Sequence, residues 1–267
     1  MKLDDYRLDG DDKVKLTRWR SDDDGGVERA AAEAAMPGLL AQMLDLQERL
    51  YAGRKRSVLI VLQGRDAAGK DGTIKHVMGG FNPLGTRVHP FKAPSEVERA
   101  HDFLWRIHSL TPEAGHVTIF NRSHYEDILV PGVRGWLDED ALERRHQHVR
   151  NFEALLVDSG VAVLKFFLHI GKDEQRARLQ ERLDDPDKRW KFDPADLTAR
   201  AERDLSRALD ERIFKCSATP ETPWYVIPAD RKWFRNYLVA QIVVHTLEGM
   251  KLRYPEPPAG LEHHRID

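Results

Sequence analysis

The sequence lacks the features that would place it outside a cell or in a membrane. It has a single cysteine, Cys216, so no internal disulfide framework can form, and a reducing cytosol is expected. No run of about 18 apolar residues occurs, which argues against a membrane-spanning helix. The first residues, MKLDDYRLDG, lack the apolar stretch of a secretory signal. We therefore expect a cytoplasmic protein with no membrane partner.

Two further absences concern metals and nucleic acids. The histidines show no metal-ligand spacing such as H-E-x-x-H, so we interpret them as structural. No basic stretch carries the interleaved aromatic residues that stack on single-stranded bases, which argues against a nucleic-acid partner. The net charge is −2, and positive charge gathers only locally, at 53–56, 144–150, 176–178 and 188–191. Solvated helix faces are the ordinary explanation of such runs.

Length and composition are those of a globular enzyme. The chain has 267 residues, of which 41% are hydrophobic and 32% charged. This length can bury a sizeable core. We expect a single domain over residues 1–267, in which the polar residues 1–26 form an extended N-terminal arm.

Buried strands alternate with helical segments along the chain. Runs rich in Val, Leu, Ile and Phe predict strands at 57–64, 116–120, 161–170 and 224–229. Helices are predicted at 27–52, 95–110, 138–158, 173–183, 194–212 and 231–252, with a break at Pro37-Gly38 in the first. This alternation predicts an α/β fold with a mainly parallel sheet, right-handed crossovers and helices on both faces.

A charged connection punctuated by prolines, residues 184–196, joins two of the predicted helices. Long connections of this kind in compact domains are often mobile lids over a functional site. We therefore expect a helical lid over about residues 173–200.

The stretch GRDAAGKDGT, residues 64–73, has the glycine spacing of a phosphate-binding loop. Its glycines allow the backbone conformations that turn N–H groups inward, and the helix expected to begin near Gly69 adds its N-terminal dipole. Lys70 would reach the terminal phosphates as a point charge. The usual motif places Ser or Thr directly after this lysine to help hold Mg²⁺, but Asp71 stands there instead.

Acidic residues near the loop are the candidates for metal binding, because Mg²⁺ prefers hard oxygen ligands. Asp66 lies inside the loop. The predicted strand 116–120 runs into NRSHYED, residues 121–127, at the edge where open α/β sheets bind their ligands. Two interpretations stay open from these residues alone, an ordinary polar loop or a Mg²⁺ site formed by Asp66 and Asp127.

Taken together, these motifs resemble those of the polyphosphate kinase 2 family. LIVLQGRDAAGKDGTIK and IFNRSHYED are similar to two of its motifs, and KRWKF with TPWYVIPADRKWFRN is similar to its C-terminal signature. The resemblance extends over roughly residues 37–250, with long motifs in the same order. It implies a P-loop kinase-like, three-layer α/β/α core with a helical lid. It also implies transfer of the terminal phosphoryl group between inorganic polyphosphate and a nucleotide, with Mg²⁺ or Mn²⁺.

The resemblance and the loop motif together assign roles to individual residues. Catalytic roles fall on Asp66, Lys70, Arg122 and Asp127, and the metal ligands are Asp66 and Asp127. Binding of the nucleotide and its phosphates falls on Gly64, Ala67, Ala68, Gly69, Asp71, Gly72, Thr73, Asn121 and Glu126. Polyphosphate binding falls on Lys75, Arg178 and Arg182. The two arginines are four residues apart and would share one helix face, with ion pairs to nearby glutamates as the alternative.

The resemblance also narrows the substrates. Asn121 and Glu126 in NRSHYED resemble the class that phosphorylates both AMP and ADP, so the expected partners are inorganic polyphosphate, AMP, ADP and ATP. A homodimer or homotetramer is implied, and the apolar segment 39–52 could contribute to its interface. The alternatives are an ATP-dependent nucleoside or nucleotide kinase of the same fold and a polyanion-binding protein without catalysis.

Overall fold

The structure, a computed structural model, describes residues 1–10, 14–260 and 264–266. Residues 11–13 of the predicted arm, and residues 261–263 and 267 of the predicted single domain, lie outside the described residues. A six-stranded sheet in the order β1-β6-β5-β2-β4-β3 forms the centre of the molecule. Its strands are β1 (Arg7–Leu8), β2 (Ser57–Gly64), β3 (Thr86–Pro90), β4 (Val117–Asn121), β5 (Val161–His169) and β6 (Trp224–Pro228).

Neighbouring strands of the sheet are parallel, except that β1 pairs antiparallel with β6. The four predicted strands are confirmed, as β2, β4, β5 and β6, to within one residue at each end. The sequence analysis missed β3 because its residues, TRVHP, are half-buried or exposed and form no apolar run. It also missed the two-residue strand β1.

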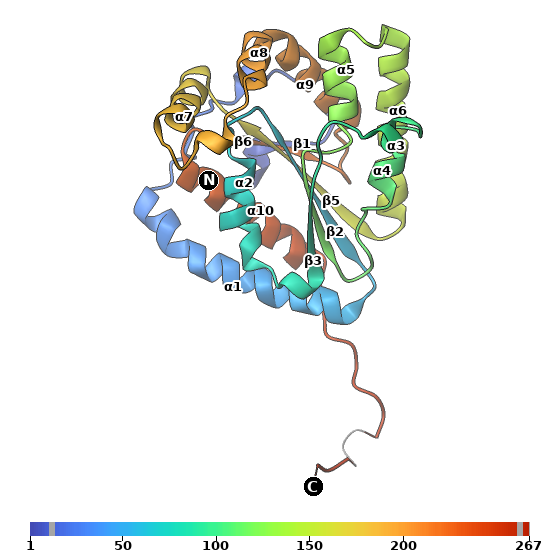
Figure 1. Cartoon of the computed structure of the whole chain (residues 1–267). Helices are drawn as coiled ribbons and strands as arrows, with labels where there is room; N and C mark the ends of the chain where they lie inside the picture. The colour runs from blue at the N-terminus through green and yellow to red at the C-terminus, as the bar shows by residue number, and fades with distance from the viewer. Residues whose placement is uncertain (11–13, 261–263, 267) are drawn as a thin grey trace.

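Helices cover both faces of the sheet and confirm the α/β/α architecture (Figure 1). One face carries α1 (Arg29–Gly53), α2 (Lys70–His76) and α10 (Lys232–Gly249), and the other carries α5 (Glu126–Arg134), α6 (Glu139–Asp158) and α9 (Arg203–Ser217). Above α2 in Figure 1 stand α7 (Lys172–Asp184) and α8 (Ala195–Ala201), which occupy the predicted lid segment.

Short helical elements complete the described chain. Two four-residue helices are α3 (Glu96–Arg99) and α4 (Trp105–His108). The 3₁₀ turns are η1 (Leu3–Tyr6), η2 (Leu16–Arg18), η3 (Met78–Gly80), η4 (Pro83–Gly85) and η5 (Arg189–Lys191). In the part of the chain that the structure describes, no helix is both long and apolar enough to cross a membrane.

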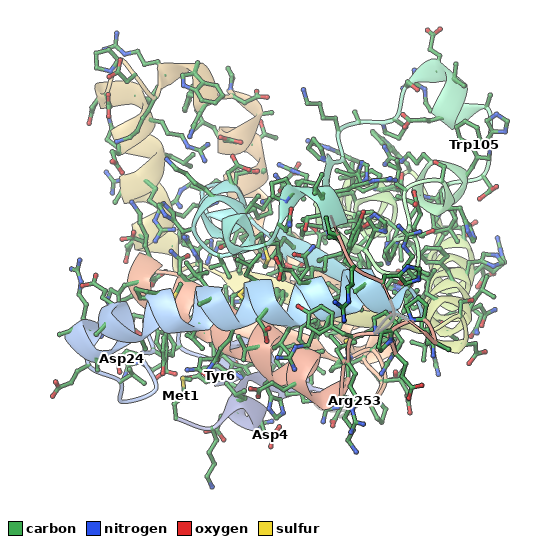
Figure 2. The ribbon with its side chains drawn as sticks, turned by 90° about the horizontal axis from the view of Figure 1, so that it is seen from below. Met1, Asp4, Tyr6, Asp24, Trp105 and Arg253 are labelled. Carbon is green, nitrogen blue, oxygen red and sulfur yellow. The ribbon has the colours of Figure 1, made fainter. Side chains whose placement is uncertain are left out.

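The predicted break at Pro37-Gly38 is wrong, since α1 is one continuous helix through both residues. Proline removes one helical hydrogen bond and crowds the carbonyl four residues earlier. Here Pro37 is exposed, so water can reach that carbonyl. The opposite side of α1 packs against α10 through buried residues such as Met43 and Leu50, which holds the helix together. Figure 2 shows α1 crossing the molecule in front of α10.

Two other helix predictions need correction. The expected helix 95–110 is interrupted and contains only α3 and α4, with Trp105 projecting from the body (Figure 2). Oδ1 of Asp102 accepts a hydrogen bond from the backbone N–H of Leu104 at 2.9 Å. This bond forms a local turn that competes with a continuous helix. The expected helix 194–212 is divided between α8 and α9.

The N-terminal segment, predicted as an extended arm over residues 1–26, packs closely on the core in its described part. Tyr6, Leu8 and Leu16 are buried, and β1 extends the sheet beside β6. Met1, Tyr6 and Asp24 lie together beneath the N-terminal part of α1 (Figure 2). The Tyr6 hydroxyl donates to Asp23 at 2.6 Å. The segment therefore contributes to the hydrophobic core.

Candidate active site

The phosphate loop connects β2 to α2, as the motif predicted. Its backbone is left-handed at Gly64 (φ +146°), Ala67 (φ +64°) and Gly69 (φ +104°). A Cβ on Gly64 would lie 2.8 Å from the carbonyl oxygen of Leu168, so the neighbouring strand requires glycine there. Ala67 adopts a conformation that costs a side-chain-bearing residue free energy and is typical of functional loops.

Lys70, the first residue of α2, bends back across this loop. Its Nζ donates to the carbonyl oxygens of Gly64 at 2.6 Å and Arg65 at 3.3 Å. Burial, together with the nearby charge of Arg122, lowers the pKa of Lys70. An ammonium group with little water around it interacts strongly with an anion, so a phosphate would be a favourable new partner for Lys70.

The segment after β4 supplies the opposite side of the site. Because β4 is adjacent and parallel to β2, with Asn121 in register with Leu62, residues 121–127 emerge beside the phosphate loop. Arg122, with a left-handed φ of +62°, donates from Nη2 to Asp66 at 2.7 Å. Its Nη1 lies 3.4 Å from Glu126. The structure thus brings together the predicted residues Asp66, Arg122 and Glu126.

Asp66 is held as a carboxylate by this environment. Burial alone would raise its pKa, but the positive charges of Lys70, Arg122 and Arg182 outweigh burial and lower it. The same three cations can contact a phosphate group entering the site. Asp66 therefore orients Arg122 and balances the local positive charge.

The residue in the usual hydroxyl position, Asp71, has a specific partner. Its Oδ1 accepts a hydrogen bond from Nδ2 of Asn121 at 2.8 Å. An aspartate at position 121 would place two like charges against each other, which an amide avoids. Asn121 and Asp71 are therefore compatible neighbours, because the amide of Asn121 donates to the carboxylate of Asp71.

Two residues predicted to bind the nucleotide or its phosphates are placed differently. Thr73 is fully buried, and its hydroxyl donates to the carbonyl of Gly69 at 3.1 Å, within its own helix. Gly72 faces Arg235, whose Nη2 would lie 3.1 Å from a Cβ built there. Both residues shape the start of α2, because the Thr73 hydroxyl is bonded within the helix and Gly72 lies against Arg235.

Asp127 is buried and paired with an arginine that the sequence analysis missed. Arg106 of α4 donates from Nη2 to Asp127 at 2.8 Å and from Nη1 to the Lys92 carbonyl at 2.9 Å. Arg145 of α6 donates to the carbonyl of Asp127. No motif indicated Arg106, since it lies in a segment with only helical composition.

A metal-binding role for Asp66 and Asp127 stays a prediction, and it would need further ligands. Among the described residues, no group of three or more His, Cys, Asp or Glu side chains is arranged to hold a metal ion. Mg²⁺ is usually bound by one or two carboxylates, with substrate phosphates and water completing its octahedron. Of the two carboxylates, Asp66 lines the cavity beside the phosphate loop, whereas Asp127 is paired with Arg106.

The prediction that Arg178 binds polyphosphate does not fit its position. All five of its N–H donors are used inside the protein. Nε donates to Glu174 at 2.7 Å, the alternative considered from the sequence. Nη1 donates to the carbonyls of Ala67 and Ala68, and Nη2 to those of Ala229 and Asp230, at 2.7–3.3 Å. The buried guanidinium therefore supports the phosphate loop from behind.

A second arginine supports the loop from the same side. Arg235 of α10, missed as an individual site residue, donates from Nη1 to the carbonyl of Ala68 at 3.2 Å. Burial and the proximity of Arg178 lower the pKa of Arg235 to about 10. A Cβ on Gly69 would lie 1.8 Å from its Nη1, so Gly69 makes room for this contact.

Arg182 is partly exposed and Lys75 is exposed, so a polyanion could reach both side chains. Arg182 donates from Nη1 to Asp196 at 3.0 Å and to the Lys191 carbonyl at 3.2 Å, and it joins α7 to both α8 and η5. Its charge also lowers the pKa of Asp66, which places it near the phosphate loop. Lys75 is exposed on α2.

A cavity of about 150 Å³ opens beside the phosphate loop. Asp66, Arg122 and Glu126 line it, and its walls are otherwise largely apolar, with contributions from α5, β5 and α9. Charged groups together with apolar walls suit a ligand that has both an anionic and an aromatic part.

A buried polar network lies beneath this segment. Lys165 of β5 donates to Glu153 of α6 at 2.5 Å, and Glu153 also accepts from the Tyr125 hydroxyl at 2.7 Å. Burial would raise the pKa of Glu153, but Lys165 and His124 lower it to about 2. Since Tyr125 belongs to the segment 121–127 and lines the cavity, the network anchors that segment to the core.

Comparison with known proteins agrees with this geometry. The profile of the family described as Polyphosphate kinase 2 (PPK2) matches residues 26–255. The chain is 48% identical to an AMP/ADP-polyphosphate phosphotransferase of Meiothermus ruber, over 96% of this chain and 97% of the relative. It is 38% identical to an ADP-polyphosphate phosphotransferase of Rhodopseudomonas palustris, over 96% of this chain and 93% of the relative.

A solved structure agrees as well. The crystal structure of Polyphosphate Kinase 2 from Arthrobacter aurescens TC1 superposes with a TM-score of 0.93 at 36% identity, covering 97% of this chain and 93% of that one. The phosphate loop, the segment after β4 and helices α7 and α8 are thus parts of a shared fold. The chain belongs to the polyphosphate kinase 2 family.

Proposed function

We propose that this enzyme transfers the terminal phosphoryl group of inorganic polyphosphate to both AMP and ADP. The observation that carries the proposal is the hydrogen bond between Asn121 and Asp71 at the mouth of the phosphate loop. An amide there leaves one negative charge fewer beside the acceptor phosphates, while Glu126 supplies one from a longer side chain. A difference of only about 1.4 kcal/mol changes acceptor preference tenfold, so one charge is enough to matter.

The two substrates are proposed to occupy different parts of the site. The phosphate loop holds the phosphates of the nucleotide, and the adjoining cavity, with its apolar walls, takes the nucleoside. Polyphosphate lies toward the lid, where Arg182 and Lys75 provide positive charge. Arginine grips phosphate oxygens in a fork, and lysine attracts them as a point charge.

The reaction then needs positioning and charge stabilisation. A phosphate oxygen of the nucleotide attacks the terminal phosphorus of polyphosphate, the bridging P–O bond breaks, and polyphosphate leaves one unit shorter. Lys70 and Arg122 stabilise the charge on the transferred group, and Asp66 orients the attacking phosphate. Both the attacking group and the leaving group are phosphates, so the same residues serve the reverse reaction.

Mg²⁺ would be held by Asp66 and Asp127, with Mn²⁺ as a substitute, and it would neutralise phosphate charge. Replacement of Asp127 by Asn keeps the shape but removes one anionic ligand. We expect a strong loss of activity that is partly restored at high Mg²⁺, measured as initial rate against Mg²⁺ concentration. An unchanged Mg²⁺ dependence would place the metal on other ligands, such as Glu126.

Location and assembly are part of the proposal. The free and half-buried Cys216 agrees with a cytoplasmic enzyme. We propose a homodimer or homotetramer, as expected from the sequence, and sedimentation velocity would distinguish these from a monomer.

The decisive experiment is a time course with AMP, long-chain polyphosphate and Mg²⁺, without adenylate kinase, followed by chromatography. We expect ADP to appear first and ATP to follow. ADP that accumulates without ATP, or AMP that is not consumed, would contradict the dual acceptor. Phosphorylation that needs ATP as donor would favour the nucleotide-kinase alternative, and binding without turnover would favour a polyanion-binding protein.

A further inference from the structure

The cavity beside the phosphate loop contains an ion pair that the phosphoryl-transfer chemistry does not use. Arg65 of the loop and Asp210 of α9 both line the cavity, and Arg65 Nη2 lies 3.1 Å from Asp210 Oδ2. Their side chains are only 14% and 8% exposed. A buried pair at this place is well situated to contact whatever part of a ligand reaches past the phosphates.

We propose that this pair recognises the base of the acceptor nucleotide, with Asp210 accepting a hydrogen bond from an exocyclic amino group and Arg65 donating to the adjacent ring nitrogen. The inference rests on the proposed function, because it places the acceptor nucleoside in the cavity. The chemical class of ligand is a purine that carries an amino group next to a ring acceptor, as adenine does.

The shape of the cavity supports a flat aromatic ligand. Apolar side chains from several elements form its walls, among them Leu129 and Val133 of α5, Phe167 of β5 and Phe214 of α9. A cavity of about 150 Å³ can accept a six-membered aromatic ring. Since Asp66 and Arg122 line the same cavity, one ligand can place its phosphates beside these two residues and its base among the apolar side chains.

The hydrogen-bonding capacity of the pair supports recognition of an amino group. Among the described residues, Asp210 accepts a side-chain hydrogen bond from Arg65 alone, and this bond is to Oδ2. Its other oxygen, Oδ1, is therefore available to a ligand. Burial, together with the charges of Glu126 and Glu211, raises the pKa of Asp210 to about 7 against the opposing effect of Arg65. The carboxylate of Asp210 has few hydrogen-bond donors around it, so an amino group of a ligand would stabilise it.

The test compares two nucleotides in two proteins. AMP and purine riboside 5′-monophosphate, which lacks only the amino group, serve as acceptors for the unsubstituted enzyme and for Asp210→Leu. We expect the unsubstituted enzyme to prefer AMP by about tenfold in kcat/KM, as for one lost hydrogen bond to a charged group. In Asp210→Leu this ratio should fall to about one, because the partner of the amino group is gone.

Asp204→Leu is the matched control, because Asp204 lies on the same helix but is 88% exposed and pairs with Arg207 at the surface. It should keep the full preference for AMP. If Asp210→Leu does not fold, judged by circular dichroism, Asp210→Asn replaces it and should reduce the ratio. A preference that is unchanged in the folded variant, or absent from the unsubstituted enzyme, overturns the inference.

The outcome can be separated from that of the proposed function. If the unsubstituted enzyme phosphorylates AMP from polyphosphate but ignores the amino group, only the inference fails. If it does not use polyphosphate at all, the proposed function fails. In that case calorimetric affinities of the same two nucleotides for the same proteins decide whether Asp210 recognises the amino group.

Discussion

The back and the front of the phosphate loop each carry two arginines, which the structure uses in opposite ways. Behind the loop, Arg178 and Arg235 are buried, with donors on backbone carbonyls that include that of Ala68. In front, Arg122 and Arg182 pair with carboxylates and keep 40% and 22% of their side chains exposed. A positive charge can serve a phosphate only when its donors face the opening, which residue type alone does not reveal.

The energetic reasons for the two arrangements also differ. Behind the loop, two like charges repel each other, and hydrogen bonds to otherwise unpaired carbonyls offset this cost. In front, each arginine has a carboxylate partner, so phosphate oxygens can compete for the same donors. The back therefore holds the loop in shape, and the front is free to exchange partners during the reaction.

The largest effect is expected at the most deeply paired charge, beneath the segment 121–127. Glu153→Gln leaves Lys165 as a buried charge without a counter-ion and should lower the free energy of unfolding by about 3–5 kcal/mol. The pKa of Glu153 falls from 4.5 to about 2 on folding, so its stabilisation is complete above pH 4.5 and is lost as the pH decreases toward 2.

Urea denaturation at several pH values checks this prediction. The difference between the unsubstituted protein and Glu153→Gln should be largest at neutral pH and shrink in acid. Glu143→Gln on the same helix is the control, since Glu143 is 65% exposed and should change stability little. A difference that does not depend on pH would mean that the pair is not ionised as inferred.

At the front of the loop, Lys70→Ala should lower kcat by at least about 10²-fold, comparable to the loss of one preorganised electrostatic donor. The fold should remain intact, because the hydrogen bonds of Lys70 are to two carbonyls of the same loop. Lys55→Ala provides the control, since Lys55 is exposed before β2, at the opposite edge of the sheet. Near-normal turnover of Lys70→Ala would show that this loop is not catalytic.

The comparison between back and front is tested most directly by Arg178→Gln and Arg182→Gln. The first leaves loop carbonyls unpaired and should destabilise the protein by about 1–3 kcal/mol, with lower rates for both substrates. The second should leave stability unchanged and raise the KM for polyphosphate, with a weaker dependence on salt. Thermal melts and initial rates at two salt concentrations measure both effects.

The opposite pattern would reverse our assignment. If Arg178→Gln raised only the KM for polyphosphate, without loss of stability, Arg178 would leave its carbonyl partners during the reaction. It would then act as a polyphosphate ligand, as the sequence first predicted. If Arg182→Gln affected only the nucleotide, the position of polyphosphate near the lid would be wrong.

Local patterns explain which predictions succeeded. Apolar runs identified β2, β4, β5 and β6 because a strand covered on both faces must be apolar along its length. The edge strand β3 has no such requirement and was missed. The break at Pro37 was mispredicted, since packing of α1 on α10 outweighs the local cost of proline.

The amino-acid sequence by itself determined the α/β architecture, the phosphate loop and the residues around it. These follow from short-range requirements, in which buried strands are apolar, tight backbone turns need glycine, and anions need cations and N–H groups. Only the tertiary structure decided which cations face the ligand. Arg178 and Arg182 share a helix, yet different elements pack against their two turns. As a result, Arg178 bonds carbonyl oxygens, whereas Arg182 lies near Asp66. That outcome depends on contacts between segments far apart in the chain, which no local pattern encodes.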